Sequence, residues 1–155
     1  NINTCPSFDL FVQIKMLKNI RFVHCSGMNF FFIDEDNGIF VFGKNTHGQL
    51  GIGSIDTIWE PTKCNNLENV HHISCGETHS AFVTTNRELY VCGSNSFGQL
   101  GFADERDSFY TPQKNANLLN IVLVSCGAYF TAVLNEDGEV FVFGSNSLGQ
   151  FGNGN

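Results

Sequence analysis

One polar loop sequence occurs three times in this chain at nearly constant spacing. It reads GKNTHGQLGI at 43–52, GSNSFGQLGF at 93–102 and GSNSLGQFGN at 144–153. The first glycines of the copies, Gly43, Gly93 and Gly144, are 50 and 51 residues apart. A fixed period of this length is typical of stacked supersecondary units. The repeat therefore constrains the fold more strongly than any other feature of the sequence.

The similarity extends into the segments that precede each loop. The strings LKNIRFVHC, LENVHHISC and LLNIVLVSC begin at 17, 67 and 118, and share Leu-x-Asn and a cysteine at matching positions. The strings FFFIDEDNGIFVFG, SAFVTTNRELYVCG and TAVLNEDGEVFVFG, which lead into the loops, align without a gap. We therefore divide the chain into three repeats, approximately 1–53, 54–103 and 104–155, that form a single domain.

Each repeat consists of short β-branched and aromatic runs separated by turn sequences. In the third repeat these runs are 121–126, 131–134 and 140–143, which is typical of antiparallel strands. The acidic, glycine-ended string NEDG at 135–138 predicts a hairpin turn. No run has a sustained 3.6-residue period, so we predict no long helix. At 7–16 the apolar residues alternate with period two, which predicts a strand before the first repeat.

Three or four short strands in a unit of about 50 residues predict a β-propeller blade. The kelch class relies on a double glycine, which is absent here, and the WD class on Trp-Asp, whereas the only tryptophan, Trp59, precedes Glu60. We predict an all-β fold of about three four-stranded antiparallel blades in an open arc. The open edges and apolar faces of such an arc need further blades or self-association to cover them.

Two motifs and the strand between them carry a family resemblance. The pattern [IV]-x-C-G-x-x-x-[ST]-A at 73–81 and 124–132, the strand VFVFG and the loop G-x-N-x-x-G-Q-[LF]-G resemble the regulator of chromosome condensation repeat over about 17–155. The first repeat departs from it with Ser26 and Asn29 in the glycine and histidine positions, and the third has Phe130 in the histidine position. The resemblance implies a seven-bladed propeller, about 350 residues at this period. We therefore expect the chain to be part of a longer propeller.

We interpret the constant loop residues as structural. The glycines suit backbone angles that a Cβ resists, the asparagines can close the turn, and the glutamines can tie the loop to the backbone of the next blade. A phosphate-binding loop is excluded because no copy ends in Gly-Lys-Ser/Thr. The structural motif comprises Gly43, Asn45, Gly48, Gln49, Gly93, Asn95, Gly98, Gln99, Gly144, Asn146, Gly149 and Gln150.

Residues that vary between the repeats are the candidates for partner contact. The acidic stretch ADERDSFY at 103–110 lies in the loop that is one residue longer than its counterpart, and loop positions commonly carry binding specificity. The alternative is an ordinary solvated loop. Trp59 and Tyr110 are repeat-equivalent, so we expect them to pack structurally. The candidate partner-binding residues are Asp104, Glu105, Arg106, Asp107, His47, Phe97 and Leu148.

The sequence contains no recognisable catalytic constellation. His79 and Ser80 are adjacent on a predicted strand and would point to opposite faces, so we expect His79 to form a structural hydrogen bond, with partner contact as the alternative. Cys25, Cys75 and Cys126 occupy one repeat-equivalent position, and Cys-x-x-Cys spacing is absent. We therefore predict buried thiols in a reducing compartment, and neither a metal site nor a cofactor.

Charge and loop length limit the functions that the chain can have. The net charge of −7 and the lack of a Lys/Arg cluster argue against direct nucleic-acid binding, and no apolar run is long enough for a membrane span. The resemblance implies either exchange factors for the small GTPase Ran, which use a wedge-like inserted hairpin, or docking modules. The connections Gly51–Pro61 and Gly101–Pro112, ten and eleven residues long, leave no room for that insertion.

We therefore predict a non-enzymatic protein-interaction propeller, cytoplasmic or nuclear, with guanine-nucleotide exchange on a Ran-type GTPase as the alternative. The expected partner is a protein, either a small GTPase or a histone-like basic protein.

Overall fold

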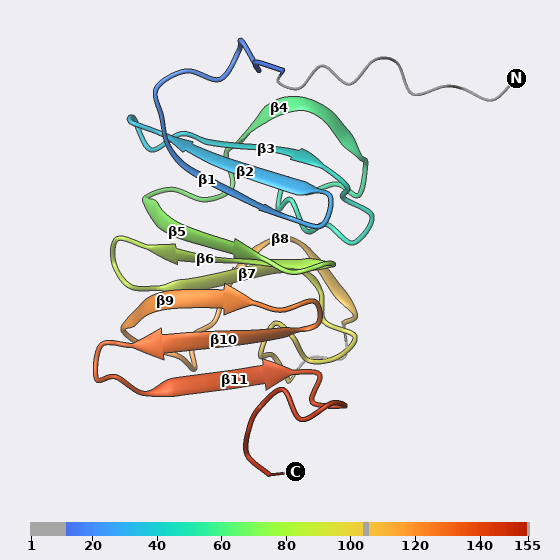
Figure 1. The fold of residues 1–155 in the computed structure, drawn as a ribbon, viewed down its shortest axis with the longest axis vertical. Coiled ribbons are helices and arrows are strands. Elements are labelled where there is room, and N and C mark those ends of the chain that lie inside the picture. The colour runs from blue at the N-terminus through green and yellow to red at the C-terminus, as the bar shows by residue number, and fades with distance from the viewer. Residues whose placement is uncertain (1–11, 104–105, 155) are drawn as a thin grey trace, which may run out of the picture.

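The computed structural model describes residues 12–103 and 106–154, and all of its regular secondary structure in these ranges is β-strand. The strands form three antiparallel sheets stacked along the long axis of the molecule (Figure 1). The prediction of an all-β fold is confirmed. The strands are β1 Ile20–Ser26, β2 Asn29–Asp34, β3 Ile39–Gly43, β4 Ile58–Cys64, β5 Val70–Cys75, β6 His79–Thr84, β7 Leu89–Ser94, β8 Ser108–Lys114, β9 Ile121–Cys126, β10 Phe130–Asn135 and β11 Val140–Gly144.

The three sheets follow one chain path. The first has the order β1-β2-β3-β4 and the second β5-β6-β7-β8, whereas the third has the three strands β11-β10-β9. The predicted four strands are thus present in two sheets, and three are present in the third within the described residues. β4 and β8 follow the constant loops and pair back onto the strands that precede them, at Gly43 with Ile58 and at Gly93 with Phe109.

This path offsets the sheets from the sequence repeats. The repeat at 54–103 supplies β4 to the first sheet and β5, β6 and β7 to the second. The boundaries that we drew at 53 and 103 therefore fall within sheets, which extend over 20–64, 70–114 and 121–144. One sequence repeat contributes to two blades.

An asparagine in the left-handed region precedes the first strand of each sheet. Asn19, Asn69 and Asn120 have φ of 52°, 56° and 55°, a conformation that asparagine tolerates better than most other residues with a Cβ. Their carbonyls accept hydrogen bonds at 2.8, 2.7 and 2.9 Å from amides in the turn between the second and third strands. The Leu-x-Asn signature thus holds the start of each sheet against its own hairpin.

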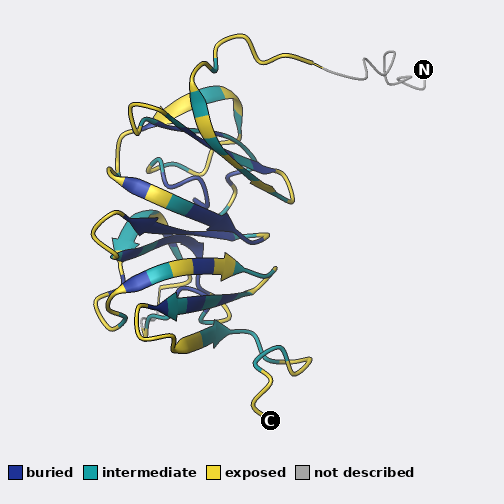
Figure 2. Ribbon diagram, turned by 60° about the vertical axis from the view of Figure 1, so that its left-hand side comes forward, coloured by how far each residue is buried: buried dark blue, intermediate teal, exposed yellow. Residues whose placement is uncertain are grey.

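Two apolar cores lie between the three sheets, so the middle sheet is buried from both sides (Figure 2). Along β2 and β3 the core residues alternate with outward-pointing residues, whereas along β6 and β7 successive residues enter the two different cores, as the pleat requires. The first core contains Phe31, Ile33, Ile39, Val41, Leu50, Cys64, Val70, Ile73, Cys75, Phe82 and Cys92. The second contains Ala81, Val83, Leu89, Val91, Leu100, Phe109, Ile121, Val124 and Val133.

Two expectations from the sequence need correction. Trp59 does not pack structurally, because its side chain is 87% exposed. Its repeat equivalent Tyr110 is less exposed, at 47%. Tyr110 lies over Gly48 of the preceding sheet, whereas no sheet precedes Trp59 in the described part of the chain. Cys25 is exposed rather than buried for the same reason. The strand predicted at 7–16 falls largely outside the described residues, and 12–16 form no strand.

Candidate protein-interaction surface

The constant loops and the turns between first and second strands lie at the same end of all three sheets, on the right in Figure 1. This follows from the antiparallel register, in which Asn29 at the start of β2 pairs with Gly43 at the end of β3. We call this end the turn end. The hairpins between second and third strands lie at the opposite end, which we call the hairpin end.

Two side chains hold each constant loop in shape. Asn45 Oδ1 accepts the amide of Leu50 at 2.9 Å, and Gln49 Oε1 accepts the amide of His47 at 2.9 Å. The second and third copies repeat both bonds, at 3.1 and 2.9 Å for the asparagine and at 2.9 and 2.8 Å for the glutamine. The loop therefore has the same conformation in every sheet, whatever residue occupies its variable position.

The loop also contacts the following sheet. The Ser80 hydroxyl donates to the Gln49 carbonyl at 2.7 Å, and the Thr131 hydroxyl donates to the Gln99 carbonyl at 2.8 Å. Gln49 Nε2 is 3.5 Å from the carbonyl of Glu77 in the next sheet. The first two loops are thus hydrogen-bonded across a blade junction as well as within themselves.

His79 lies fully buried in the second of these junctions. Its Nε2 is 2.8 Å from the Thr131 hydroxyl, and that hydroxyl already uses its proton on the Gln99 carbonyl. Nε2 must therefore carry a proton, which leaves Nδ1 as an acceptor, and Nδ1 is buried without a partner. Burial lowers the pKa of His79 to about 4. At neutral pH the ring is therefore uncharged and acts as a hydrogen-bond donor at the junction.

Variable residues at the turn end expose apolar surface. Met28 is 69% exposed, Phe97 56%, Tyr129 36% and Leu148 89%. Phe97 reaches across the junction and contacts Tyr129, with ring centroids 5.2 Å apart. Phe97 and Leu148 are among the contact residues predicted from the sequence, whereas Met28 and Tyr129 are not. Met28 and Tyr129 occupy one repeat-equivalent position, which holds Met, Thr and Tyr in the three repeats. This variation between repeats is the property by which the other contact candidates are chosen.

A hollow of about 360 Å³ opens at the turn end and is lined by turns of all three sheets. Its walls are the turns 26–28 and 126–128, with Lys44 and Glu77 beside them. The Tyr129 hydroxyl donates to Glu77 Oε2 at 2.8 Å, and this bond to the carboxylate raises the pKa of Tyr129. The hollow thus combines apolar walls with one carboxylate and one ammonium group.

The other predicted contact residues that the structure describes are Arg106, Asp107 and His47. Asp104 and Glu105 lie outside the described residues. The Arg106 guanidinium stands 4.3 Å from the centroid of the Phe109 ring, and the carbonyl of Asp107 accepts the amide of Asn95 at 2.7 Å. His47 is half-buried and contacts Thr46. Asp107 therefore adjoins the loop that carries Phe97.

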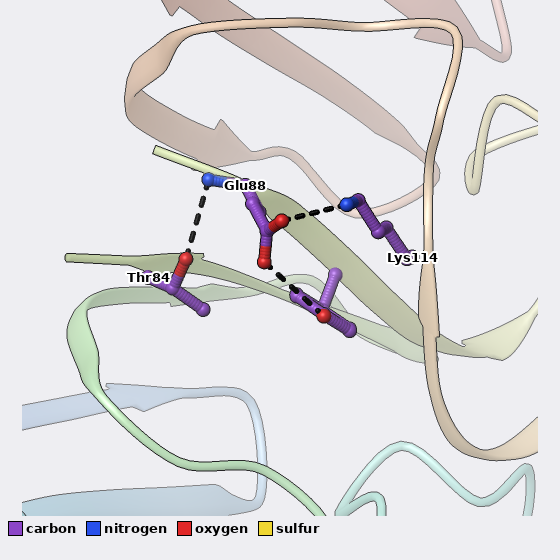
Figure 3. A network of polar contacts seen from close by, with 4 residues as sticks. Thr84, Glu88 and Lys114 are labelled. Carbon is purple, nitrogen blue, oxygen red and sulfur yellow. Dashed lines mark hydrogen bonds and ion pairs between the residues drawn. The ribbon is translucent and has the colours of Figure 1, made fainter. Parts of the chain in front are cut away.

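The hairpin end of the second sheet carries a polar network of a different kind (Figure 3). Glu88 pairs with Lys114 at 2.6 Å and accepts the Tyr90 hydroxyl at 3.3 Å, while its amide donates to the Thr84 hydroxyl at 3.2 Å. Lys114 lowers the pKa of the Glu88 carboxyl. These bonds tie β8 to the hairpin between β6 and β7, which is a structural role.

The described residues place no three His, Cys, Asp or Glu side chains close enough to hold a metal ion. In the same part of the chain, no helix has the length and apolar character required to cross a membrane.

Stacked antiparallel sheets with an apolar core at each junction define the blades of a β-propeller. The chain belongs to the regulator of chromosome condensation (RCC1) repeat family, whose models match residues 36–83 and 88–134 and, in a second form, 70–99 and 121–150. The fold is also that of Prp20p from Saccharomyces cerevisiae, described with its binding properties to Gsp1p and histones. That match has a TM-score of 0.77 and 20% identity, and covers 83% of this chain and 34% of Prp20p.

Curated relatives are much longer than this chain. The chain is 36% identical over 135 residues to the X-linked retinitis pigmentosa GTPase regulator of Canis lupus familiaris, which covers 84% of this chain and 14% of the relative. It is 33% identical over 149 residues to the human probable E3 ubiquitin-protein ligase HERC6, covering 90% of this chain and 15% of that protein. The similarity therefore concerns a small part of each relative.

Proposed function

We propose that this chain is a protein-interaction module that binds its partner at the turn end of the blades. The observation that carries the proposal is the exposed pair Phe97 and Tyr129, which lies across a blade junction with Glu77 beside it. Aromatic residues are enriched where protein interfaces have most of their binding energy. The constant loop residues beneath this pair hold the fold, so the variable positions are free for recognition.

The proposed partner is a basic protein. Glu77 stands at the hollow, Asp107 adjoins the loop that carries Phe97, and the chain has a net charge of −7. Complementary charge favours encounter with a positively charged surface. Prp20p, which shares the fold, is described as binding Gsp1p and histones, so a histone and a small GTPase are the first partners to test. We place the module in the cytoplasm or nucleus, where free thiols such as those of the described cysteines persist.

A binding titration with a matched control tests this proposal. Core histones and a Ran-type GTPase are titrated separately against the full chain and against Phe97→Ser and Leu119→Ser variants. Leu119 is 69% exposed but lies at the hairpin end. We expect Phe97→Ser to weaken binding about tenfold or more, which is about 1.4 kcal/mol, and Leu119→Ser to leave it unchanged. Equal effects of the two substitutions, or no binding of either protein, would overturn the proposal.

Guanine-nucleotide exchange is the second candidate, because a relative bears the name of a GTPase regulator. Against it, the described parts of the connections between β3 and β4 and between β7 and β8 contain no inserted hairpin. We therefore expect this chain to accelerate release of a fluorescent guanine nucleotide from Ran-type or Rho-type GTPases less than about tenfold, or about 1.4 kcal/mol of barrier. Stronger acceleration would promote exchange over docking.

A further inference from the structure

Side chains connect the first strand of each sheet to the first strand of the next. At the second junction the Ser74 hydroxyl of β5 accepts the backbone amide of Cys126 in β9 at 2.9 Å. At the first junction the repeat-equivalent residue is His24 of β1, whose Nε2 accepts the amide of Cys75 in β5 at 3.2 Å. Cys75 and Cys126 are themselves repeat-equivalent. The same bond to the backbone therefore has a hydroxyl acceptor at one junction and an imidazole acceptor at the other.

The two acceptors respond differently to acid. A hydroxyl keeps its acceptor lone pairs in mild acid, whereas an imidazole that gains a second proton is a donor at both nitrogens. Protonation of His24 would place an N–H against the N–H of Cys75, and two donors do not form a hydrogen bond. Histidine is also the side chain whose ordinary pKa lies in the mildly acidic range. The first junction thus contains a hydrogen bond that mild acid removes, and the second contains its acid-resistant counterpart.

The ionisable groups on the strands around His24 are mostly cations and thiols. They are Arg21 and Cys25 on β1, His71, His72 and Cys75 on β5, and Cys126 on β9. β2, which pairs with β1, has one carboxylate, Asp34, and it lies at the far end of that ladder from His24. Arg21 donates to the Val70 carbonyl at 3.2 Å, near the hairpin end. A proton on His24 is therefore added to a region that already carries positive charge.

These surroundings favour the neutral ring. Burial lowers the pKa of His24 below its ordinary value of 6.5, and a charge on His72 lowers it further, against a smaller raising effect of the Cys75 backbone. A histidine with a lowered pKa in the folded state is stabilising in its neutral form. The bond is therefore intact above pH 6.5 and is lost as the pH falls through the lowered pKa.

The two partners of this bond lead directly into the walls of the hollow at the turn end. The turn 26–28 begins two residues after His24, and Glu77 stands two residues after Cys75, and both line the hollow. Towards the hairpin end, Phe22 packs edge-on against His72, with ring centroids 5.9 Å apart. The hydrogen bond therefore fixes how far apart the two walls stand, while the aromatic contact holds the rest of the strand pair.

We propose that protonation of His24 releases the turn end of the first blade junction, so that the hollow changes shape and binds its partner less tightly as the pH falls. The second junction, where Ser74 is the acceptor, stays closed. The effect on binding rests on the proposed function, whereas the release of the junction does not.

Hydrogen exchange at individual amides tests the proposal with the full chain, because it reports the two equivalent bonds separately. His24→Ser places at the first junction the residue that the second and third repeats carry at this position. His71→Ser is the matched control, since it removes an exposed histidine from the same pair of strands and leaves the bond in place. Protection of the Cys75 amide is compared with that of the Cys126 amide at pH 7 and pH 5, after correction for the intrinsic exchange rates. The nitrogen signals of the His24 ring report its protonation independently.

We expect protection of the Cys75 amide, relative to the Cys126 amide, to fall about tenfold or more between pH 7 and pH 5 in the unmodified chain and in His71→Ser. In His24→Ser the two amides should change together. In the unmodified chain, Nε2 of His24 should be unprotonated at pH 7, and its protonation should coincide with the loss of protection at Cys75. The ratio of the two amides removes any general loss of stability in acid, because such a loss affects both.

Equal changes at the two amides of the unmodified chain would overturn the proposal, as would a pH-dependent loss at Cys75 that persists in His24→Ser. If serine fails to restore the bond at pH 7, the ring titration of the unmodified chain decides alone. Protonation of His24 without loss of protection at Cys75 would then refute the proposal.

Binding is measured separately so that the two proposals can fail independently. Core histones and a Ran-type GTPase are titrated against the unmodified chain and His24→Ser at pH 7 and pH 5. We expect the unmodified chain to lose about threefold or more in affinity, relative to His24→Ser, at the lower pH. Equal changes for both chains would overturn the link between the junction and the hollow. No binding at either pH would overturn the proposed function and leave the amide result to decide on the junction.

Discussion

Protonation of His79 should destabilise the fold as the pH falls. The ring is fully buried, its Nε2 donates to the Thr131 hydroxyl, and its Nδ1 has no partner. A second proton would place a buried positive charge on the ring and a donor at Nδ1 with nothing to accept it. Both effects penalise the charged form.

The magnitude follows from the pKa difference between the two states. The pKa is about 4 in the folded protein against 6.5 for the free side chain. The unfolded chain therefore binds a proton first, and the free energy of unfolding is highest above pH 6.5 and falls towards pH 4. Integrating this difference from pH 7 to pH 4 gives a loss of about 3 kcal/mol from this one group, a large part of the stability of a small domain.

A matched variant separates His79 from the other titrating groups. His79→Gln retains a nitrogen that can donate to Thr131 but does not titrate, so it should be less stable at pH 7 and less sensitive to acid. Urea unfolding at pH 7, 6, 5 and 4 measures both proteins. We expect the stability advantage of the unmodified chain to shrink by about 3 kcal/mol between pH 7 and 4. An advantage that is constant over this range would refute the burial argument.

Four substitutions probe the constant loop and its junction by thermal or urea unfolding. Gly93→Ala should destabilise by about 3 kcal/mol, because φ is 100° and the new Cβ would collide with the Thr78 backbone carbonyl, whereas Gly98→Ala, with φ of 73° and open space, should lose about 1 kcal/mol. Equal losses would contradict this reading. Asn95→Ala should remove the loop-closing bond at a cost of about 1 kcal/mol. Thr131→Val should destabilise by about 1–3 kcal/mol by unpairing two buried groups, and a neutral result would show that the junction bonds add nothing.

Local features of the fold could be predicted from the sequence because they depend on neighbours within one repeat. The string at 135–138 forms the hairpin between β10 and β11, and the glycine-ended runs end β3 and β11 and reach the last residue but one of β7. The repeat period predicted three similar units, and the structure has three sheets. The conformation of a turn and the alternation of side chains along a strand both depend on about ten consecutive residues.

Contacts between blades could not be predicted in the same way. His79 meets Thr131 and Glu77 meets Tyr129, and each pair is separated by 52 residues, about one repeat. The period indicates that such blades are neighbours, but which side chains touch depends on how the sheets pack. The packing prediction for Trp59 was wrong because its repeat-equivalent neighbour would belong to a sheet before the first.

The offset between repeats and sheets has a consequence for making chimeras from this family. A segment exchanged at the repeat boundaries, 54–103, would insert β4 of the donor into the first sheet of the recipient and leave β8 of the recipient to complete the donor's blade. Two hybrid sheets would result, each with a foreign hydrogen-bonding partner on one edge. The transplantable module therefore spans the second sheet, 70–114, and grafts cut in the short connections on either side of it should keep every ladder within one parent.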